Sequence, residues 1–214
     1  MGRQLALDDI IDLRAYERVR EDVRRQTIEL KRRRRVAVGP IVTLLFENRD
    51  TIWFQVQEMA RAERMTTDAA ITGELDAYNP LIPEPGQLSA TLFVELTGEE
   101  ALRHWLPRLV GIERSVELRL GGAAVEGDGG AGVGRAGTGP PIVVRSVPEA
   151  AHEQALTRQE VTAAVHYIRF ELDPAQVDRF SSGPVVLAVT HPEYQQAVTL
   201  DDPVRTELLA DLQP

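Results

Sequence analysis

The sequence predicts an α+β protein with a long N-terminal helix, a β-hairpin followed by a pair of helices, and a mixed or antiparallel sheet built from two β–α–β units. Three observations indicate this class. Apolar residues recur every three or four positions in residues 7–34, a β-branched run fills residues 36–46, and strand–helix–strand patterns occur twice after residue 87. The 214 residues are 43% hydrophobic and 27% charged, which is typical of a folded domain.

The first element is a predicted helix over residues 7–34. Its apolar stripe consists of Ile10, Leu13, Tyr16, Val19, Val23 and Leu30. Asp8 and Asp9 stand at its start and Lys31–Arg35 at its end, which is the polarity that the helix dipole favours.

A β-hairpin and two helices are predicted next. Residues 36–46 form the first strand, 47–50 the turn and 51–56 the second strand. The pattern becomes helical at Gln57, and a second helix is predicted for residues 68–78 behind capping residues.

Prolines mark the best candidate for an internal boundary, residues 79–87, because they end the preceding helix and keep the chain extended. The boundary divides a region of helices and hairpin, 1–87, from a sheet region, 88–214. We expect the two regions to pack as one compact unit.

The second half contains two similar units. The predicted strand, helix and strand are 88–96, 98–111 and 113–120 in the first unit, and 163–172, 173–182 and 184–190 in the second. In both, the first strand ends in Glu-Leu before a helix cap, although strand–helix–strand order also recurs by chance. A glycine-rich loop, 121–141, separates the units, the polar stretch 147–161 is a candidate short helix, and a strand near 196–200 and a helix at 203–212 close the chain.

Composition excludes several classes of site. The chain has no cysteine, so disulfides, thiolate metal sites and cysteine nucleophiles are excluded. It has no apolar stretch long enough for a membrane span and no signal-peptide pattern at its start, so we expect a cytoplasmic protein. The net charge of −9 disfavours broad phosphate binding. The oligomeric state is not indicated.

The glycine-rich loop contains a match to a dinucleotide-binding motif, but its surroundings argue against such a site. Gly132–Gly137 matches G-x-G-x-x-G, but Pro140 and Pro141 follow, so no helix can begin in register to face a pyrophosphate. No cofactor is therefore predicted.

The basic run Lys31–Arg35 is the strongest charge cluster, and Arg32, Arg33 and Arg34 are candidate binding residues. Nucleic-acid or anionic-lipid binding is one interpretation, and a helix C-terminus whose cations meet the last carbonyls is the other. No interleaved aromatic residues support nucleic-acid binding. Docking of an acidic partner protein is a third use of the run.

The expected hairpin tip concentrates polar side chains. Glu47, Asn48, Arg49 and Asp50 lie there, beside Gln55, Gln57 and Glu58. Loops on rigid strands often carry function, so this cluster is a candidate binding surface, with an ordinary exposed turn as the alternative.

Histidines suggest a possible metal site. His166 lies on a predicted strand with Tyr167 and Arg169, and His191 ends a later strand. If those strands pair, His166 and His191 could approach each other near Glu171 or Glu193 and hold zinc or iron. The alternative is two structural histidines, since no HExxH spacing is present.

Five segments together resemble a bacterial family known as domain of unknown function 3501. They are LALDDIIDLRAYERVREDVR, KRRRRVAVGPIVTLLFENRDTIWFQVQEMARAERM, ELDAYNPLIP, SATLFVEL and AVHYIRFEL, in that order over nearly the whole chain. The resemblance implies an accessory role beside redox enzymes and assigns no residue a role. The positions that match the family's segments are candidate binding residues only. They are Glu47, Asn48, Arg49, Asp50, Gln55, Gln57, Glu58, Met59, Arg61, Glu63, Arg64, Tyr78, Asn79, Pro80, His166, Tyr167, Arg169 and Phe170.

We therefore expect a non-enzymatic accessory or binding protein that takes a redox partner or a small anionic ligand. The expected working surface is the basic run with the polar cluster at 47–50. Two alternatives remain open: a metal-dependent enzyme or metal-binding protein using His166 and His191, and an RNA-binding protein using Lys31–Arg35.

Overall fold

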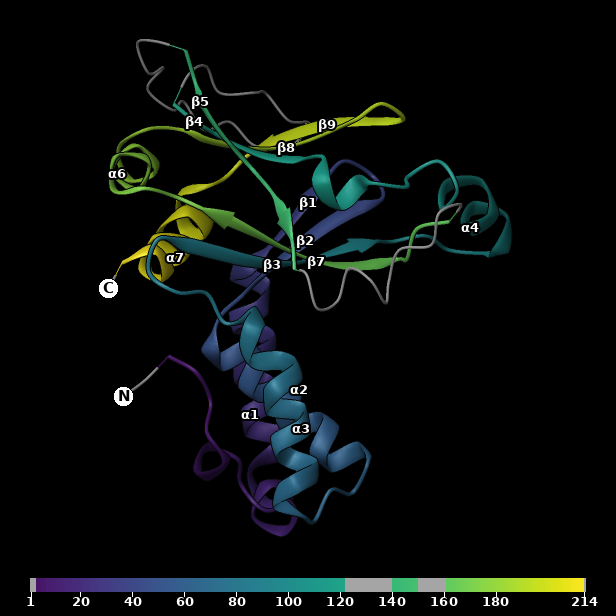
Figure 1. The fold of residues 1–214 in the computed structure, drawn as a ribbon, viewed down its shortest axis with the longest axis vertical. Coiled ribbons are helices and arrows are strands. Elements are labelled where there is room, and N and C mark those ends of the chain that lie inside the picture. Colours follow the sequence, from purple (N-terminus) through teal and green to yellow (C-terminus); the bar gives the residue numbers. More distant parts are fainter. Residues whose placement is uncertain (1–2, 122–139, 150–160, 214) are drawn as a thin grey trace.

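Two antiparallel sheets pack face to face, and a helical arm extends from one of them (Figure 1). The structure is a computed structural model that describes residues 3–121, 140–149 and 161–213. Most of the predicted glycine-rich loop 121–141, with the G-x-G-x-x-G match, lies outside the described residues, as does most of the predicted polar segment 147–161.

The first sheet has the strand order β1-β2-β3-β7-β6. Its strands are β1 (Arg35–Val38), β2 (Val42–Glu47), β3 (Gln87–Val94), β7 (Val165–Glu171) and β6 (Val147–Pro148). The second sheet has the order β5-β4-β8-β9, from β5 (Ile142–Arg145), β4 (Val116–Leu120), β8 (Val185–His191) and β9 (Tyr194–Thr199). Alternate residues of both sheets point inward, so Phe46, Leu88, Phe170 and Leu187 form one buried core.

The two predicted β–α–β units are present, but each runs from one sheet to the other. The first passes from β3 through α4 (Glu99–Trp105) and a 3-10 turn (Ile112–Arg114) to β4, and the second passes from β7 through α6 (Pro174–Ser182) to β8. Because β3 pairs with β7 and β4 pairs with β8, the units build two antiparallel sheets where one sheet was expected. Figure 1 shows α4 and α6 at opposite ends of the sandwich.

The predicted hairpin exists, but its turn is not where the sequence indicated. β1 pairs with β2, and the turn lies at residues 39–41, where Gly39 has a φ of +74° and no room for a Cβ beside Tyr194. The expected tip at 47–50 and the second strand at 51–56 are wrong, because this region begins helix α2 (Arg49–Ala62).

Capping and packing explain why residues 51–56 are helical. The Asn48 side chain accepts a hydrogen bond from the Thr51 N–H, and the Thr51 hydroxyl accepts one from the Asn48 N–H, both at 2.9 Å. Ile52 and Val56 are then four residues apart on a buried helical face. Tertiary burial therefore overrides the β propensity of these residues.

Helices α1 (Leu13–Arg34), α2 and α3 (Asp68–Tyr78) form the arm, which stands off the five-stranded sheet (Figure 1). The long helix begins at Leu13 rather than residue 7, because Asp12 caps it and Leu7–Asp9 form a separate 3-10 turn. Helix α7 (Asp202–Leu212) closes the chain and packs beside α1. No helix in the described part of the chain is both long enough and apolar enough to cross a bilayer.

Candidate functional site

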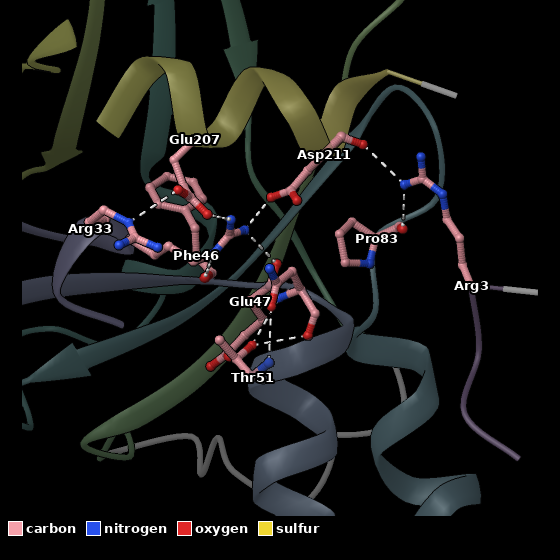
Figure 2. Close-up of polar contacts among 10 residues, drawn as sticks. Arg3, Arg33, Phe46, Glu47, Thr51, Pro83, Glu207 and Asp211 are labelled. Carbon is pink, nitrogen blue, oxygen red and sulfur yellow. Dashed lines mark hydrogen bonds and ion pairs between the residues drawn. The ribbon is translucent and has the colours of Figure 1, made fainter. Parts of the chain in front are cut away.

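The junction of β2 and α2 surrounds Arg34, which is wholly buried at the end of α1. Its Nε donates to the Phe46 carbonyl at 2.8 Å and its Nη2 to the Glu47 carbonyl at 3.2 Å. Glu207 lies 3.3 Å from its Nη1, and Asp211 pairs with its Nη2. Figure 2 shows Glu207 and Asp211 directed from α7 toward the end of β2. Burial raises the pKa of the Asp211 carboxyl, an effect that the positive charge of Arg34 opposes.

The rest of the basic run also has partners. Arg32 pairs with Glu29 at 2.9 Å and Arg33 with Glu207 at 3.3 Å. Arg35 pairs with Glu95 at 3.3 Å, and Lys31 lies over the Phe54 ring at 5.6 Å. Each cation of the run therefore makes a contact within the protein, although Arg32 and Arg33 remain exposed. Arg34 cannot belong to an exposed binding surface, as the sequence interpretation assumed, because it is buried.

The four polar residues of the expected tip take different roles. Glu47 is buried and accepts a hydrogen bond from the Thr91 hydroxyl at 2.6 Å. Asn48 caps α2. Arg49 pairs with Asp9 at 2.8 Å, which lowers the pKa of Asp9 together with a larger contribution from the Ala6 backbone N–H. Asp50 is exposed. Only Arg49 and Asp50 of this group present charge at the surface.

Glu47, Tyr167 and Arg169 share the outer face of the five-stranded sheet. Ser89 on β3 pairs with Glu47 on β2 and with Arg169 on β7. Two residues further along β3, Thr91 pairs with Tyr167 on β7. Burial raises the pKa of Tyr167, with smaller contributions from Tyr78 and Glu47. The structure thus brings three of the candidate residues onto one face, at the base of the arm, where Tyr167 packs against the core of the helices.

Gln57, Glu58 and Arg61 hold the arm together. The Gln57 side chain exchanges two hydrogen bonds with the backbone of Ile11, at 3.0 and 2.9 Å. Glu58 accepts from the Tyr16 hydroxyl at 2.7 Å and from two Arg20 nitrogens at 2.9 Å each. Arg61 pairs with Glu17 at 2.6 Å. Burial and the bond to Glu58 raise the pKa of Tyr16.

We expect the stability difference between the wild type and Glu58→Gln to shrink as the pH falls. Arg20, and to a lesser extent Tyr16, hold the pKa of Glu58 below its ordinary 4.5, so the ionised carboxylate stabilises the folded state. This contribution is present above pH 4.5 and is lost as the pH falls through the lower pKa of the folded protein. Urea unfolding at pH 7 and at about pH 3 measures it.

Glu29→Gln is the control for that experiment, because the exposed Glu29–Arg32 pair contributes little to stability. A Glu58→Gln difference of equal size at both pH values would show that the charge on Glu58 does not stabilise the fold.

His166 and His191 lie on strands of different sheets that are not paired with each other, so the pairing on which the metal site depended is absent. His166 contacts the Thr162 hydroxyl at 2.8 Å and the Ala163 carbonyl at 3.0 Å, and burial lowers its pKa. His191 contacts the Val110 carbonyl at 3.1 Å. Among the described residues, no three His, Asp or Glu side chains form a group that could hold a metal ion. Both histidines make structural hydrogen bonds.

Sequence reasoning missed Arg3, Glu207 and Asp211. Glu207 and Asp211 are four residues apart on the predicted terminal helix, so their shared face was visible in the sequence. Their contact with Arg34 was not, since it joins residues 173 and 177 positions apart.

Two surface cavities lie beside the residues described above, one near Arg49 and Asp211 and the other near Glu17 and Arg61. One, of about 190 Å³, lies at the junction and is lined by Arg3, Arg49, Asp50 and Asp211 among others. The other, of about 550 Å³, lies at the tip of the arm, where Leu13, Glu17, Arg61, Arg64 and Thr66 line it.

Comparisons with known proteins give a family and a fold. A family model described as "Protein of unknown function (DUF3501)" matches residues 4–137 and 142–212. A crystal structure of a novel protein of unknown function from Burkholderia pseudomallei is 34% identical to this chain. The similarity covers 98% of this chain and 100% of that one, with a TM-score of 0.82. No curated protein matches the chain.

Proposed function

The chain belongs to the family of proteins of unknown function DUF3501, and from this premise we propose that it is a non-enzymatic accessory protein that docks a partner protein at the tip of its helical arm. The observation that carries the proposal is the open groove of about 550 Å³ between α1, α2 and the turn that follows α2. The arm has its own small core and projects from the sandwich (Figure 1), which leaves this groove accessible to another protein.

The backbone at the groove explains how Arg64 is presented. Arg64 has a φ of +52° because it ends α2 in the left-handed conformation of a helix C-cap, in which the Met65 N–H donates to the Ala60 carbonyl at 2.9 Å. Its side chain is exposed. Arg61 lines the same groove but is paired with Glu17, whereas Arg64 has no ion pair with any residue that the structure describes and supplies an available positive charge.

This charge favours an acidic segment on the partner. The association with redox enzymes that the family resemblance implies makes a redox enzyme the first partner to test. The Tyr16–Glu58–Arg20 contacts fix the helices that form the groove, so docking would use a preformed surface and require little ordering.

We expect the tagged wild type, expressed in its own host, to retain a specific partner whose cross-links map to residues 61–66. Arg64→Glu should abolish retention, because it replaces an attraction with a repulsion at the groove. Affinity capture followed by cross-linking and mass spectrometry measures both effects.

The matched control is Arg103→Glu, which reverses an exposed arginine on α4, outside the arm. Retention that survives Arg64→Glu, or cross-links confined to the sandwich, would overturn docking at the arm tip. The absence of any retained partner for the wild type would overturn the accessory role.

A further inference from the structure

The side of α1 that faces solvent carries a regular line of side chains. Tyr16 and Arg34 mark the buried side of this helix, and Arg25 lies two and a half turns from each of them, so it points the opposite way. Along this opposite side, positions recur alternately after four and three residues, which is the spacing that a coiled-coil helix presents to its neighbour. All six side chains are exposed, and together we call them the α1 seam: Arg14, Arg18, Glu21, Arg25, Ile28 and Arg32.

The α1 seam is basic although the protein as a whole is acidic. Helix α1 contains nine basic and four acidic residues, so it carries +5 while the chain carries −9. Arg14 and Arg18 make no ion pair with any residue in the part of the chain that the structure describes. Arg25 and Arg32 pair with acidic neighbours on the same helix, but both side chains stay 74% exposed. Pairs this exposed contribute little, so all four guanidinium groups can take a new partner.

Ile28 adds an apolar contact point to the α1 seam. At 52% it is the most exposed large apolar side chain among the described residues. A single exposed apolar residue is ordinary, but this one lies on the seam between Arg25 and Arg32. In a coiled coil, the same position packs into the facing helix.

The charges of the seam favour one kind of occupant. A second copy of the chain is disfavoured, because antiparallel pairing places Arg14 opposite Arg32 and parallel pairing places each arginine opposite itself. A nucleic acid is disfavoured, because Glu21 interrupts the line of arginines and would face phosphate. An acidic helix fits: carboxylates spaced by three and four residues meet the arginines, a basic side chain meets Glu21 and an apolar one packs on Ile28.

We propose that the α1 seam docks an acidic α-helix of a partner protein, which lies along α1 as the second helix of a short coiled coil. The contact extends for about 27 Å from Arg14 to Arg32. Charge-assisted hydrogen bonds from the guanidinium groups to carboxylates set the register, and burial of Ile28 adds apolar area. The arm-tip groove lies on the side of α1 that carries Leu13 and Glu17, so this proposal does not rest on docking at the groove.

A synthetic helical peptide of about three heptads tests the seam on the full chain. On the face toward the seam it carries glutamate opposite the four arginines, lysine opposite Glu21 and leucine opposite Ile28. Fluorescence anisotropy should give a dissociation constant below about 100 μM, about tenfold or more tighter than for the same peptide with every seam charge reversed. Arg25→Glu should weaken binding of the acidic peptide by about tenfold, because it places like charges opposite each other. Ile28→Gln should weaken it severalfold, because it removes the apolar contact.

Arg24→Glu is the matched control, because Arg24 is exposed on the same helix but points more than a quarter turn away from Arg25. It should bind the acidic peptide as the wild type does. Arg64→Glu, at the arm-tip groove, should do the same, which separates a failure of the seam from a failure of the groove. If Arg24→Glu and Arg25→Glu weaken binding equally, the attraction is unspecific and the seam is overturned. The same conclusion follows if the charge-reversed peptide, or a duplex RNA of similar length, binds as tightly as the acidic peptide.

Photo-cross-linking in the host identifies the occupant. Benzoylphenylalanine in place of Ile28 should link the full chain to a partner segment whose acidic residues recur every three or four positions, and Arg25→Glu should abolish that link. Links to a second copy of the chain or to a nucleic acid, a link that survives Arg25→Glu, or the absence of any link would contradict the proposed partner.

Discussion

Replacing Arg34 with methionine should lower the free energy of unfolding by about 3–5 kcal/mol, since removing one partner of a buried ion pair leaves the other charge uncompensated. Asp211 is mostly buried beside Arg34, and Glu207 relies on the same guanidinium. The carbonyls of Phe46 and Glu47 lose their donors as well. Chemical denaturation at neutral pH, monitored by far-UV circular dichroism, measures the change.

Two variants serve as controls for Arg34→Met. Arg32→Met removes an exposed arginine of the same basic run, and its effect should stay within about 0.5 kcal/mol. The double variant Arg34→Met with Asp211→Leu should be more stable than Arg34→Met alone, because it also removes the buried carboxylate. If Arg34→Met and Arg32→Met have equal effects, the buried cluster does not stabilise the fold.

Replacing Tyr16 with alanine should destabilise the arm by about 3–5 kcal/mol, the usual cost of removing a buried aromatic ring. Tyr16 is wholly buried, meets Trp53 edge to face at 6.2 Å between ring centroids, and donates to Glu58 at 2.7 Å. Because these contacts all lie within the helices, the loss should be local. Hydrogen exchange should show faster exchange in α1 and α2 while β3 and β7 keep their protection.

Tyr16→Phe separates packing from hydrogen bonding. It keeps the ring and should cost about 1 kcal/mol, the net contribution of one hydrogen bond. Equal loss of protection in the arm and in the sandwich after Tyr16→Ala would contradict a local effect and would mean that the two unfold as one unit.

Tyr16→Ala and Arg34→Met should also differ in their effects on the proposed docking. Tyr16 does not line the groove at the tip of the arm. It nevertheless packs α1 against α2, and these two helices form the walls of the groove. A loosened arm must be ordered again on binding, which weakens affinity. Arg34→Met acts at the other end of α1. If the arm stays folded in this variant, the groove keeps its shape and docking should persist.

Local patterns were predicted well where caps and periodicity agree. The helix at 68–78 begins behind Thr67, whose side chain accepts from the Ala70 N–H, and its bounds match the prediction. The helix of the second unit begins at Pro174 behind the capping residue Asp173, and both signals are visible in the sequence. Both elements depend on residues within a few positions of each other, so the signal is contained in the sequence.

The junction was predicted poorly, because its local signals conflict. Thr51–Val56 has strong β propensity, and only the exchange of hydrogen bonds between Asn48 and Thr51 and the burial of Ile52 turn it into a helix. Because of this conflict, the sequence did not show that residue 47 ends β2, that residue 48 caps α2 and that residues 49–50 begin this helix. Their role as a binding surface stays a prediction, but their expected geometry was wrong.

By itself the sequence determined the α+β class, the long first helix, the helix at 68–78 and the order of the two β–α–β units, because periodicity and capping act over a few neighbouring residues. Only the tertiary structure decided that the units build two sheets, that His166 and His191 lie in different sheets, and that Arg34 is buried. The physical reason is that the environment of a charge depends on which distant groups reach it. Arg34 differs from Arg32 only in the helical face on which it lies and in the α7 carboxylates that meet it there.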